Sequence, residues 1–114
     1  MKVIVKRATL VKLSLLIVEF TSLPLMVLAS IYLFSGYQML NPEVKVIPEP
    51  RRIHMDRFLR ILAIFLMYLH ALGGIIIVAE RRFRREAKRK MIEAALIMAI
   101  TMLLIAFLII ELGV

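Results

Sequence analysis

Three long apolar runs restrict what this chain can fold into. Residues 61–79 carry no charged side chain, and the runs at 13–40 and 91–110 carry a single carboxylate each. At about 1.5 Å per helical residue, each run covers most or all of the roughly 30 Å hydrocarbon core of a bilayer. Each run can therefore cross a membrane as a helix.

A water-soluble fold cannot hide these runs. Hydrophobic residues make up 62% of the 114 residues, and a chain this short lacks the polar surface to cover three helices that are apolar on all sides. Lipid offers no water to the backbone, so each run should be α-helical, since a barrel would show alternating segments of about ten residues. We predict an all-α integral membrane protein, an antiparallel bundle of three transmembrane helices in one domain, residues 1–114.

Charged and proline-containing segments set the expected boundaries. The three helices, which extend the apolar runs slightly, are expected at about residues 10–38, 55–84 and 88–112. The loop at 39–54 should be non-helical, because Pro42, Pro48 and Pro50 interrupt it. A basic turn within residues 80–90 should join the last two helices.

The first run has an alternative interpretation as a secretory signal. Basic residues precede it, and Val27-Leu28-Ala29 has the small residues of a cleavage site. The run nevertheless continues beyond this site to Phe34 and contains Glu19. A retained helix fits these features better, while cleavage of the first segment stays open as the alternative.

Lys and Arg outnumber Asp and Glu by 16 to 8, and their placement points to a membrane rather than to nucleic acid. Seven of them form a basic loop after the second run: Arg81, Arg82, Arg84, Arg85, Lys88, Arg89 and Lys90. The first twelve residues carry four more, and in a three-span protein these two segments lie on one side. The other side carries five. Because positive short loops stay in the cytoplasm, we predict a multi-pass protein of the cell membrane with a cytoplasmic amino terminus, an external 39–54 loop and an external carboxyl terminus.

The basic loop has two interpretations. It can act as a topology determinant whose charges rest in water or on anionic lipid headgroups, at about 1 kcal/mol each. Alternatively, it can dock a soluble acidic partner or a specific lipid. The sequence favours the first interpretation, with the lipid bilayer and other membrane helices as partners and no nucleic acid.

Ionisable side chains inside the apolar runs are costly, at roughly 2.5 to 3.5 kcal/mol when charged and facing lipid. Glu19 and His70 are such residues. Counted from the expected cytoplasmic ends, Glu19, His70 and Thr101 fall within about 6 Å of one another in depth. We therefore predict that Glu19 and His70 form an interhelical polar pair, with Thr101 and Ser22 nearby. The pair would either hold helices together or handle protons, ions or a cofactor.

Each expected helix carries a stripe of small or polar residues at helical spacing, the kind of face that close packing in lipid prefers. The stripes are Glu19, Ser22, Met26 and Ser30; Ala63, Met67, His70 and Gly74; and Ala95, Ala99, Met102 and Ala106. We expect these three stripes to form the helix contacts.

Ser35-Gly36 near the end of the first helix, His54 before the second and Leu69-His70 within it loosely resemble the small cytochrome anchors of respiratory complexes. The resemblance implies a haem b held between histidines of facing helices. On one continuous helix, however, His54 and His70 would lie about 24 Å apart on roughly opposite faces, and neither other helix has a histidine. Haem b at His70 would therefore need a second chain, and no cofactor is otherwise predicted.

Motifs for catalysis or metal binding are missing from the sequence. It has no cysteine, no glycine-rich phosphate loop, no His-Glu-x-x-His helix and no nucleophile motif. We expect a non-enzymatic anchor or accessory subunit of a larger membrane complex, or a homo-oligomer, with no catalytic residue and no metal site. The alternative is an electron- or ion-transfer component, either b-type cytochrome-like or a proton or ion path, that uses His70 and Glu19.

Overall fold

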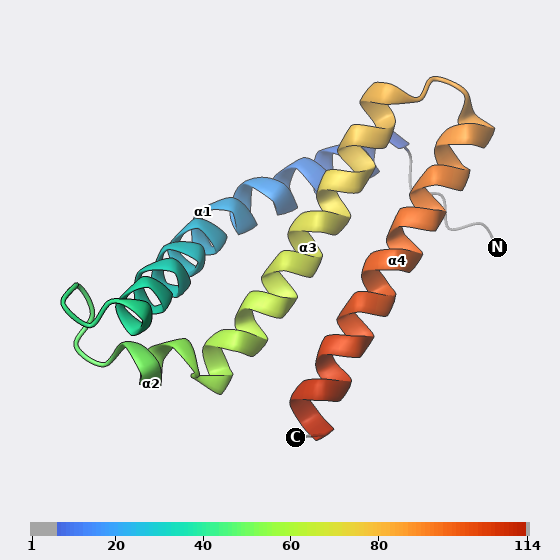
Figure 1. Ribbon diagram of the computed structural model, residues 1–114. Coiled ribbons are helices and arrows are strands. Elements are labelled where there is room, and N and C mark those ends of the chain that lie inside the picture. The colour runs from blue at the N-terminus through green and yellow to red at the C-terminus, as the bar shows by residue number, and fades with distance from the viewer. Residues whose placement is uncertain (1–6, 114) are drawn as a thin grey trace.

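The computed structural model describes residues 7–113, and this part of the chain is helical apart from short connections. The elements are α1 (Arg7–Leu40), α2 (Pro50–His54), α3 (Arg57–Arg82) and α4 (Glu86–Gly113) (Figure 1). Three of them, α1, α3 and α4, are long and apolar enough to cross a membrane. The expected all-α protein with three candidate spans is thereby confirmed.

Helix α3 is central to the arrangement. It packs against α1 and against α4, whereas α1 and α4 are not packed on each other along their described lengths. Consecutive long helices run in opposite directions (Figure 1). The arrangement is therefore open, and one face of α1 and one face of α4 are turned away from α3.

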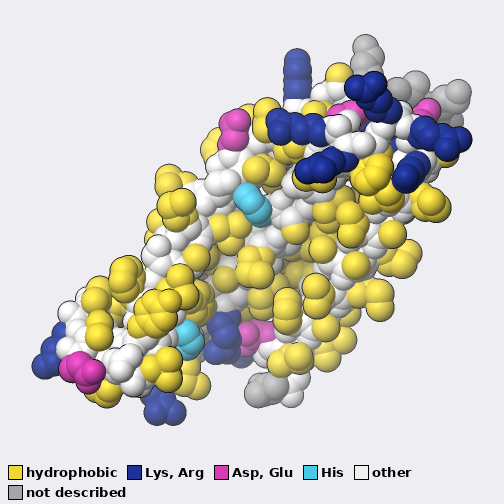
Figure 2. Space-filling view, turned by 45° about the horizontal axis from the view of Figure 1, so that its top comes forward, with side chains coloured by type: hydrophobic (Ala, Val, Ile, Leu, Met, Phe, Trp, Pro, Cys, Tyr) yellow, Lys and Arg dark blue, Asp and Glu magenta, His cyan; other side chains and the backbone are white. Residues whose placement is uncertain are grey.

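The two ends of the molecule differ in charge and in what they join. The turn end contains the start of α1 and the α3–α4 turn at residues 83–85, and Lys and Arg side chains gather there (Figure 2). The loop end contains the connection between α1 and α3 and the last turn of α4 (Figure 1). Two lysines of the basic amino-terminal lead, Lys2 and Lys6, lie outside the described residues.

Helix α1 continues through Pro24. Proline has no N–H to donate to the carbonyl four residues earlier, and in lipid such a loss is tolerated only where nearby groups satisfy the backbone. The carbonyl that loses its donor here is that of Phe20, four residues before Pro24. The nearby hydroxyls bond other carbonyls, from Thr21 Oγ1 to Ile17 O at 2.7 Å and from Ser22 Oγ to Val18 O. Despite the proline, α1 is one helix of 34 residues.

The connection between α1 and α3 is only partly the non-helical loop that we expected. Pro50 begins α2 rather than preventing it, because a proline in the first helical position has no N–H that needs an intrahelical partner. The loop at 41–49 is closed by Gln38. Its Nε2 donates to Ile47 O at 2.6 Å, and its Oε1 accepts the N–H groups of Val46 and Ile47.

Asp56 separates α2 from α3. Its carboxylate accepts the N–H of Leu59 at 2.9 Å, which is the bond expected of a helix N-cap, and α3 begins at the next residue. His54 and His70 therefore lie on different helices. The premise that they share one continuous helix is wrong, and the 24 Å separation based on it does not apply.

The contact between α1 and α3 depends on small residues. Four of the five buried side chains of α1 recur every seven residues, namely Ser14, Thr21, Leu28 and Ser35, and the fifth is Gln38. Gly73 lies beside the first of them, where an added Cβ would lie 2.9 Å from Ser14 O and 3.0 Å from Val18 Cγ2. A Cβ at Gly74 would meet no atom within 4 Å. Close approach of the two backbones therefore requires the first of these adjacent glycines and not the second.

These contacts correct the expected stripes. Helix α1 meets α3 through the face that contains Thr21, whereas the stripe from Glu19 to Ser30 is exposed. On α4 the residues of the expected stripe, Ala95, Ala99, Met102 and Ala106, are also exposed. Small residues occur on more than one face of these helices, so spacing alone did not identify the face that α3 covers.

Candidate functional site

His70 is bonded to α1 in the middle of the candidate span formed by α3. Its Nδ1 lies 2.9 Å from Thr21 Oγ1, and the same hydroxyl lies 2.7 Å from Ile17 O. The hydroxyl has one proton, which can go to Ile17 O or to His70 Nδ1, so both tautomers of the imidazole fit this contact. His70 is the central residue of the uncharged run 61–79. We call its depth the mid-span level.

Glu19 lies on the opposite side of α1 from this bond. Two helical residues turn the chain by about 200°, so when Thr21 faces α3, Glu19 faces away from it. Glu19 is exposed, and among residues 7–113 no hydrogen bond or ion pair to its carboxyl group is formed. Ser22 is exposed as well. The structure thus joins His70 to Thr21 and leaves Glu19 and Ser22 on the outer surface of α1.

A second polar bond at the same level joins α3 to α4. The hydroxyls of Tyr68 and Thr101 lie 2.9 Å apart. Tyr68 precedes His70 by two residues, so Thr101 lies close in depth to His70, as expected. The bonds of Thr101 and Thr21 nevertheless reach different sides of α3, and the expected cluster of polar groups is divided between two interfaces.

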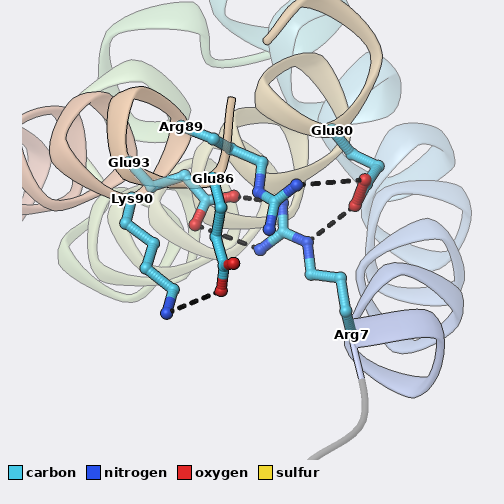
Figure 3. A network of polar contacts seen from close by, with 6 residues as sticks. All are labelled: Arg7, Glu80, Glu86, Arg89, Lys90 and Glu93. Carbon is cyan, nitrogen blue, oxygen red and sulfur yellow. Dashed lines mark hydrogen bonds and ion pairs between the residues drawn. The ribbon is translucent and has the colours of Figure 1, made fainter. Parts of the chain in front are cut away.

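A charged network fastens all three long helices at the turn end (Figure 3). The guanidinium of Arg7 in α1 donates from Nε to Glu80 Oε1 at 2.7 Å. Its Nη1 and Nη2 form a bidentate contact with the carboxylate of Glu93 in α4. Arg89 Nη1 lies 3.8 Å from the other oxygen of Glu80. Paired contacts between guanidinium and carboxylate are among the stronger protein hydrogen bonds. Sequence reasoning did not assign roles to Arg7, Glu80 or Glu93, although each stands where an apolar run ends.

The basic loop is divided between inward and outward charges. Arg89 points into the network just described, and Lys90 pairs with Glu86 at 3.0 Å one turn away. Lys88 lies over the ring of Phe83, 5.7 Å from its centroid. Four arginines of the loop are exposed: Arg81, Arg82, Arg84 and Arg85. These four are the residues placed to meet a lipid headgroup or another anion.

The loop end has its own fastening between α3 and α4. Arg60 donates from Nε and Nη2 to the two carboxylate oxygens of Glu111, at 2.9 and 2.8 Å. Arg57 donates to the backbone carbonyl of Glu111 at 3.1 Å. The Glu111 side chain is only 9% exposed. Helix α4 is therefore tied to α3 by ion pairs at both ends.

His54 is also held at the loop end. Its Nδ1 lies 2.8 Å from Ser35 Oγ, and the ring of Tyr32 meets its ring edge to face. Ser35 is fourteen residues beyond Thr21, which is about 21 Å along α1. The two histidines, one held by Ser35 and the other by Thr21, are thus too far apart to bind the same iron. If a haem is bound, His70 Nε2 is the ligand atom available at the mid-span level.

Two surfaces of the molecule, one on α1 and one on α4, are turned away from α3. The α1 outer face consists of exposed residues spaced alternately three and four apart: Lys12, Leu15, Glu19, Ser22, Met26, Ala29 and Leu33. The α4 outer face consists of Ala95, Ala99, Met102, Ala106 and Ile109, which are also exposed. Comparison of the chain with protein-family models, curated proteins and solved structures finds no match. The function is therefore argued from these surfaces and from the polar bonds.

Proposed function

We propose that this protein is a non-enzymatic, multi-pass subunit of the cell membrane that assembles with other transmembrane helices. The observation that carries the proposal is the exposure of Glu19 on the α1 outer face, within an otherwise apolar run. An intramembrane carboxyl group normally faces other protein, because hydrocarbon offers it no hydrogen bond. A partner helix against this face would supply one.

The rest of the molecule supports a structural role. The other polar groups at the mid-span level join helices of the same chain, Thr21 to His70 and Tyr68 to Thr101. Charged groups at both ends do the same for α3 and α4. The outer faces of α1 and α4 combine small residues with exposed methionines, a composition that allows helices to approach closely in lipid.

The charge distribution supports a cytoplasmic turn end. The start of α1 and the basic loop share that end, so positive charge accumulates on one side, as the positive-inside rule requires of short cytoplasmic segments. Anionic headgroups are the partners that fit its four exposed arginines. A reporter enzyme fused to the carboxyl terminus should be active only outside the cytoplasm, and cytoplasmic activity would refute this orientation.

A second candidate function, electron or proton transfer, rests on His70. Its Nδ1 is engaged by Thr21, and in the tautomer that has the proton on Nδ1, the lone pair on Nε2 can bind a proton or a metal at the mid-span level. Such a role needs a second group, because Glu19 faces the other way. A Soret band in the purified protein that is lost in His70→Leu would favour haem binding over the purely structural role.

The size of the native assembly tests the proposed function. The protein should be extracted from membranes with a mild detergent and its mass measured by light scattering, after subtraction of the bound detergent. We expect a protein mass well above the 13.1 kDa of one chain, and lower mass when Glu19→Leu and Ala99→Leu are combined. A wild-type particle that contains a single chain and no other protein would contradict the proposal.

A further inference from the structure

Glu19 lies near the middle of the membrane. Thr21 is bonded to His70, which is the central residue of the uncharged run 61–79. Glu19 precedes Thr21 by two residues, or about 3 Å along the helix axis. The exposed carboxyl group therefore lies within a few ångströms of the mid-span level, deep in the hydrocarbon when the three helices cross a bilayer. A protein group at matching depth would supply the hydrogen bond that hydrocarbon does not.

The α1 outer face can serve as a helix-pairing surface. Residues spaced three and four apart lie along one side of a helix and can contact a second helix over its length. Exposed residues on another side, such as Leu23 and Val27, have the same spacing, and the feature that distinguishes the α1 outer face is Glu19. Ser22 and Ala29 are seven residues apart on this face, and both are small enough for a second backbone to approach. The opposite face of α1 also repeats every seven residues and is the one that packs on α3. Both faces of α1 thus have helix-packing geometry, and only one is occupied.

The surfaces that can pack against Glu19 differ in the hydrogen-bonding side chains that they present to its carboxyl group. The α4 outer face of another copy presents Ala99 and Met102 near this depth and has no hydrogen-bonding side chain among its residues. The α1 outer face of another copy presents a second Glu19. Copies related by a two-fold axis along the membrane normal have Glu19 at the same depth without any further adjustment. Neutral carboxyl groups both donate and accept, so two of them can bond reciprocally, with the Ser22 oxygens one turn away as further acceptors.

We infer that two copies of this protein pair through their α1 outer faces, with Glu19 beside its equivalent in the partner copy and the small residues Ser22 and Ala29 at the closest approach. The inference rests on the proposed function and names its partner. It also leaves the α4 outer faces at the two edges of the dimer, where helices of other proteins can be added.

Disulfide cross-linking in native membranes tests the pairing, because the chain has no cysteine of its own. Ser22→Cys and Ala29→Cys should each move most of the protein to a band of twice the monomer mass on a non-reducing gel. Val27→Cys is the matched control, since Val27 is 52% exposed on the other side of the same helix. Ala99→Cys probes the α4 outer face. We expect both control variants to stay monomeric on the gel.

The carboxyl pair has a separate test. Glu19→Leu should raise the dissociation constant of the dimer by about 3- to 20-fold, the effect expected from one hydrogen bond between membrane helices. Glu19→Gln should bind nearly as tightly as the wild type, because a carboxamide also donates and accepts. Energy transfer between labelled chains in micelles or liposomes measures these constants. Equal affinities for Glu19→Leu and the wild type would overturn the role of the carboxyl group.

Other cross-linking results would overturn the pairing and show where it failed. Cross-linking at Val27→Cys or Ala99→Cys but not at Ser22→Cys would assign the contact to a different face. No cross-linking at Ser22→Cys, within a native particle larger than one chain, would refute self-pairing and leave the proposed assembly with other proteins intact. A native particle that contains a single chain and no other protein would refute both the self-pairing and the proposed assembly. Retention of the wild-type unfolding midpoint in each variant shows that a lost band reflects lost contact and not misfolding.

Discussion

The two sides of α3 are packed in different ways. Towards α1, Gly73 allows the backbones to approach closely, and three of the buried side chains of α1, Ser14, Thr21 and Ser35, carry hydroxyl groups. Towards α4, larger side chains leave a half-open pocket of about 100 Å³, with Tyr68, Ala71, Leu104 and Phe107 in its lining. No described residue of α4 is fully buried. The same central helix thus makes one close contact along its length and one looser contact fastened at its ends.

This difference shows what holds helices together in lipid. A large apolar side chain gains little free energy when it moves from lipid to a protein interface, because both surroundings are apolar. Attraction between helices therefore depends on close van der Waals contact and on polar bonds. Gly73 provides the close contact for α1. Helix α4 relies instead on polar bonds, from Arg60 to Glu111 at one end, from Arg89 to Glu80 at the other and between Tyr68 and Thr101 in the middle. We therefore expect the α3–α4 contact to tolerate changes in side-chain volume that the α1–α3 contact does not.

The largest expected effect comes from adding one methyl group to the close contact. Gly73→Ala would place Cβ 2.9 Å from a backbone oxygen of α1, and should destabilise the fold by about 1 to 3 kcal/mol because the helices must move apart. Gly74→Ala is the matched control and should be close to neutral, since its Cβ would enter open space. Unfolding by SDS in mixed micelles measures both variants. Similar losses for the two would mean that the α1–α3 contact is not the close one.

Added side-chain volume should have the opposite effect on the other side of α3. Ala71 lines the pocket towards α4, so Ala71→Val should fill part of it and stabilise the fold by about 0.5 kcal/mol or more, as cavity-filling changes commonly do. Ala99→Val, on the α4 outer face, adds the same methyl groups without a neighbour and should leave the unfolding midpoint unchanged. If Ala71→Val were as destabilising as Gly73→Ala, the contrast between the two interfaces would fail.

A third effect, also below about 1 kcal/mol, concerns the polar bond of the α1–α3 contact. A double-mutant cycle of Thr21→Val with His70→Leu should give a coupling energy of about 0.6 kcal/mol, typical of hydrogen bonds between membrane helices. The cycle of Glu19→Leu with His70→Leu should be additive, because Glu19 faces away from α3. SDS unfolding again provides the stabilities. Coupling of His70 to Glu19 but not to Thr21 would reverse the assignment of faces on α1.

Much of the architecture follows from length and charge alone. The span of residues 61–79 lies entirely within α3, and the count of three apolar runs correctly predicted that the start of α1 and the α3–α4 turn share an end. These features need only the rise of a helix and the thickness of a bilayer. The depth of His70 relative to Thr101 follows from the same arithmetic.

The faces of the helices were not predictable in this way. Glu19 and Thr21 are equally close to His70 in depth, and what separates them is a rotation of about 200° that depends on where the neighbouring helix sits. Gly73 and Gly74 differ by one helical step, yet only one of them touches α1. When small residues occupy two faces of a helix, spacing identifies both faces and leaves the partner of each undetermined.

Gln38 shows how a single side chain can give an exposed loop a defined shape. It meets one carbonyl and two amides of residues 46 and 47, which are the contacts that a neighbouring β-strand would otherwise provide. Because Gln38 is buried at the end of α1, the conformation of this loop is coupled to the position of that helix. A rotation or displacement of α1 would therefore change the shape of the surface exposed at the loop end. A protein bound to this loop would then respond to a movement of α1.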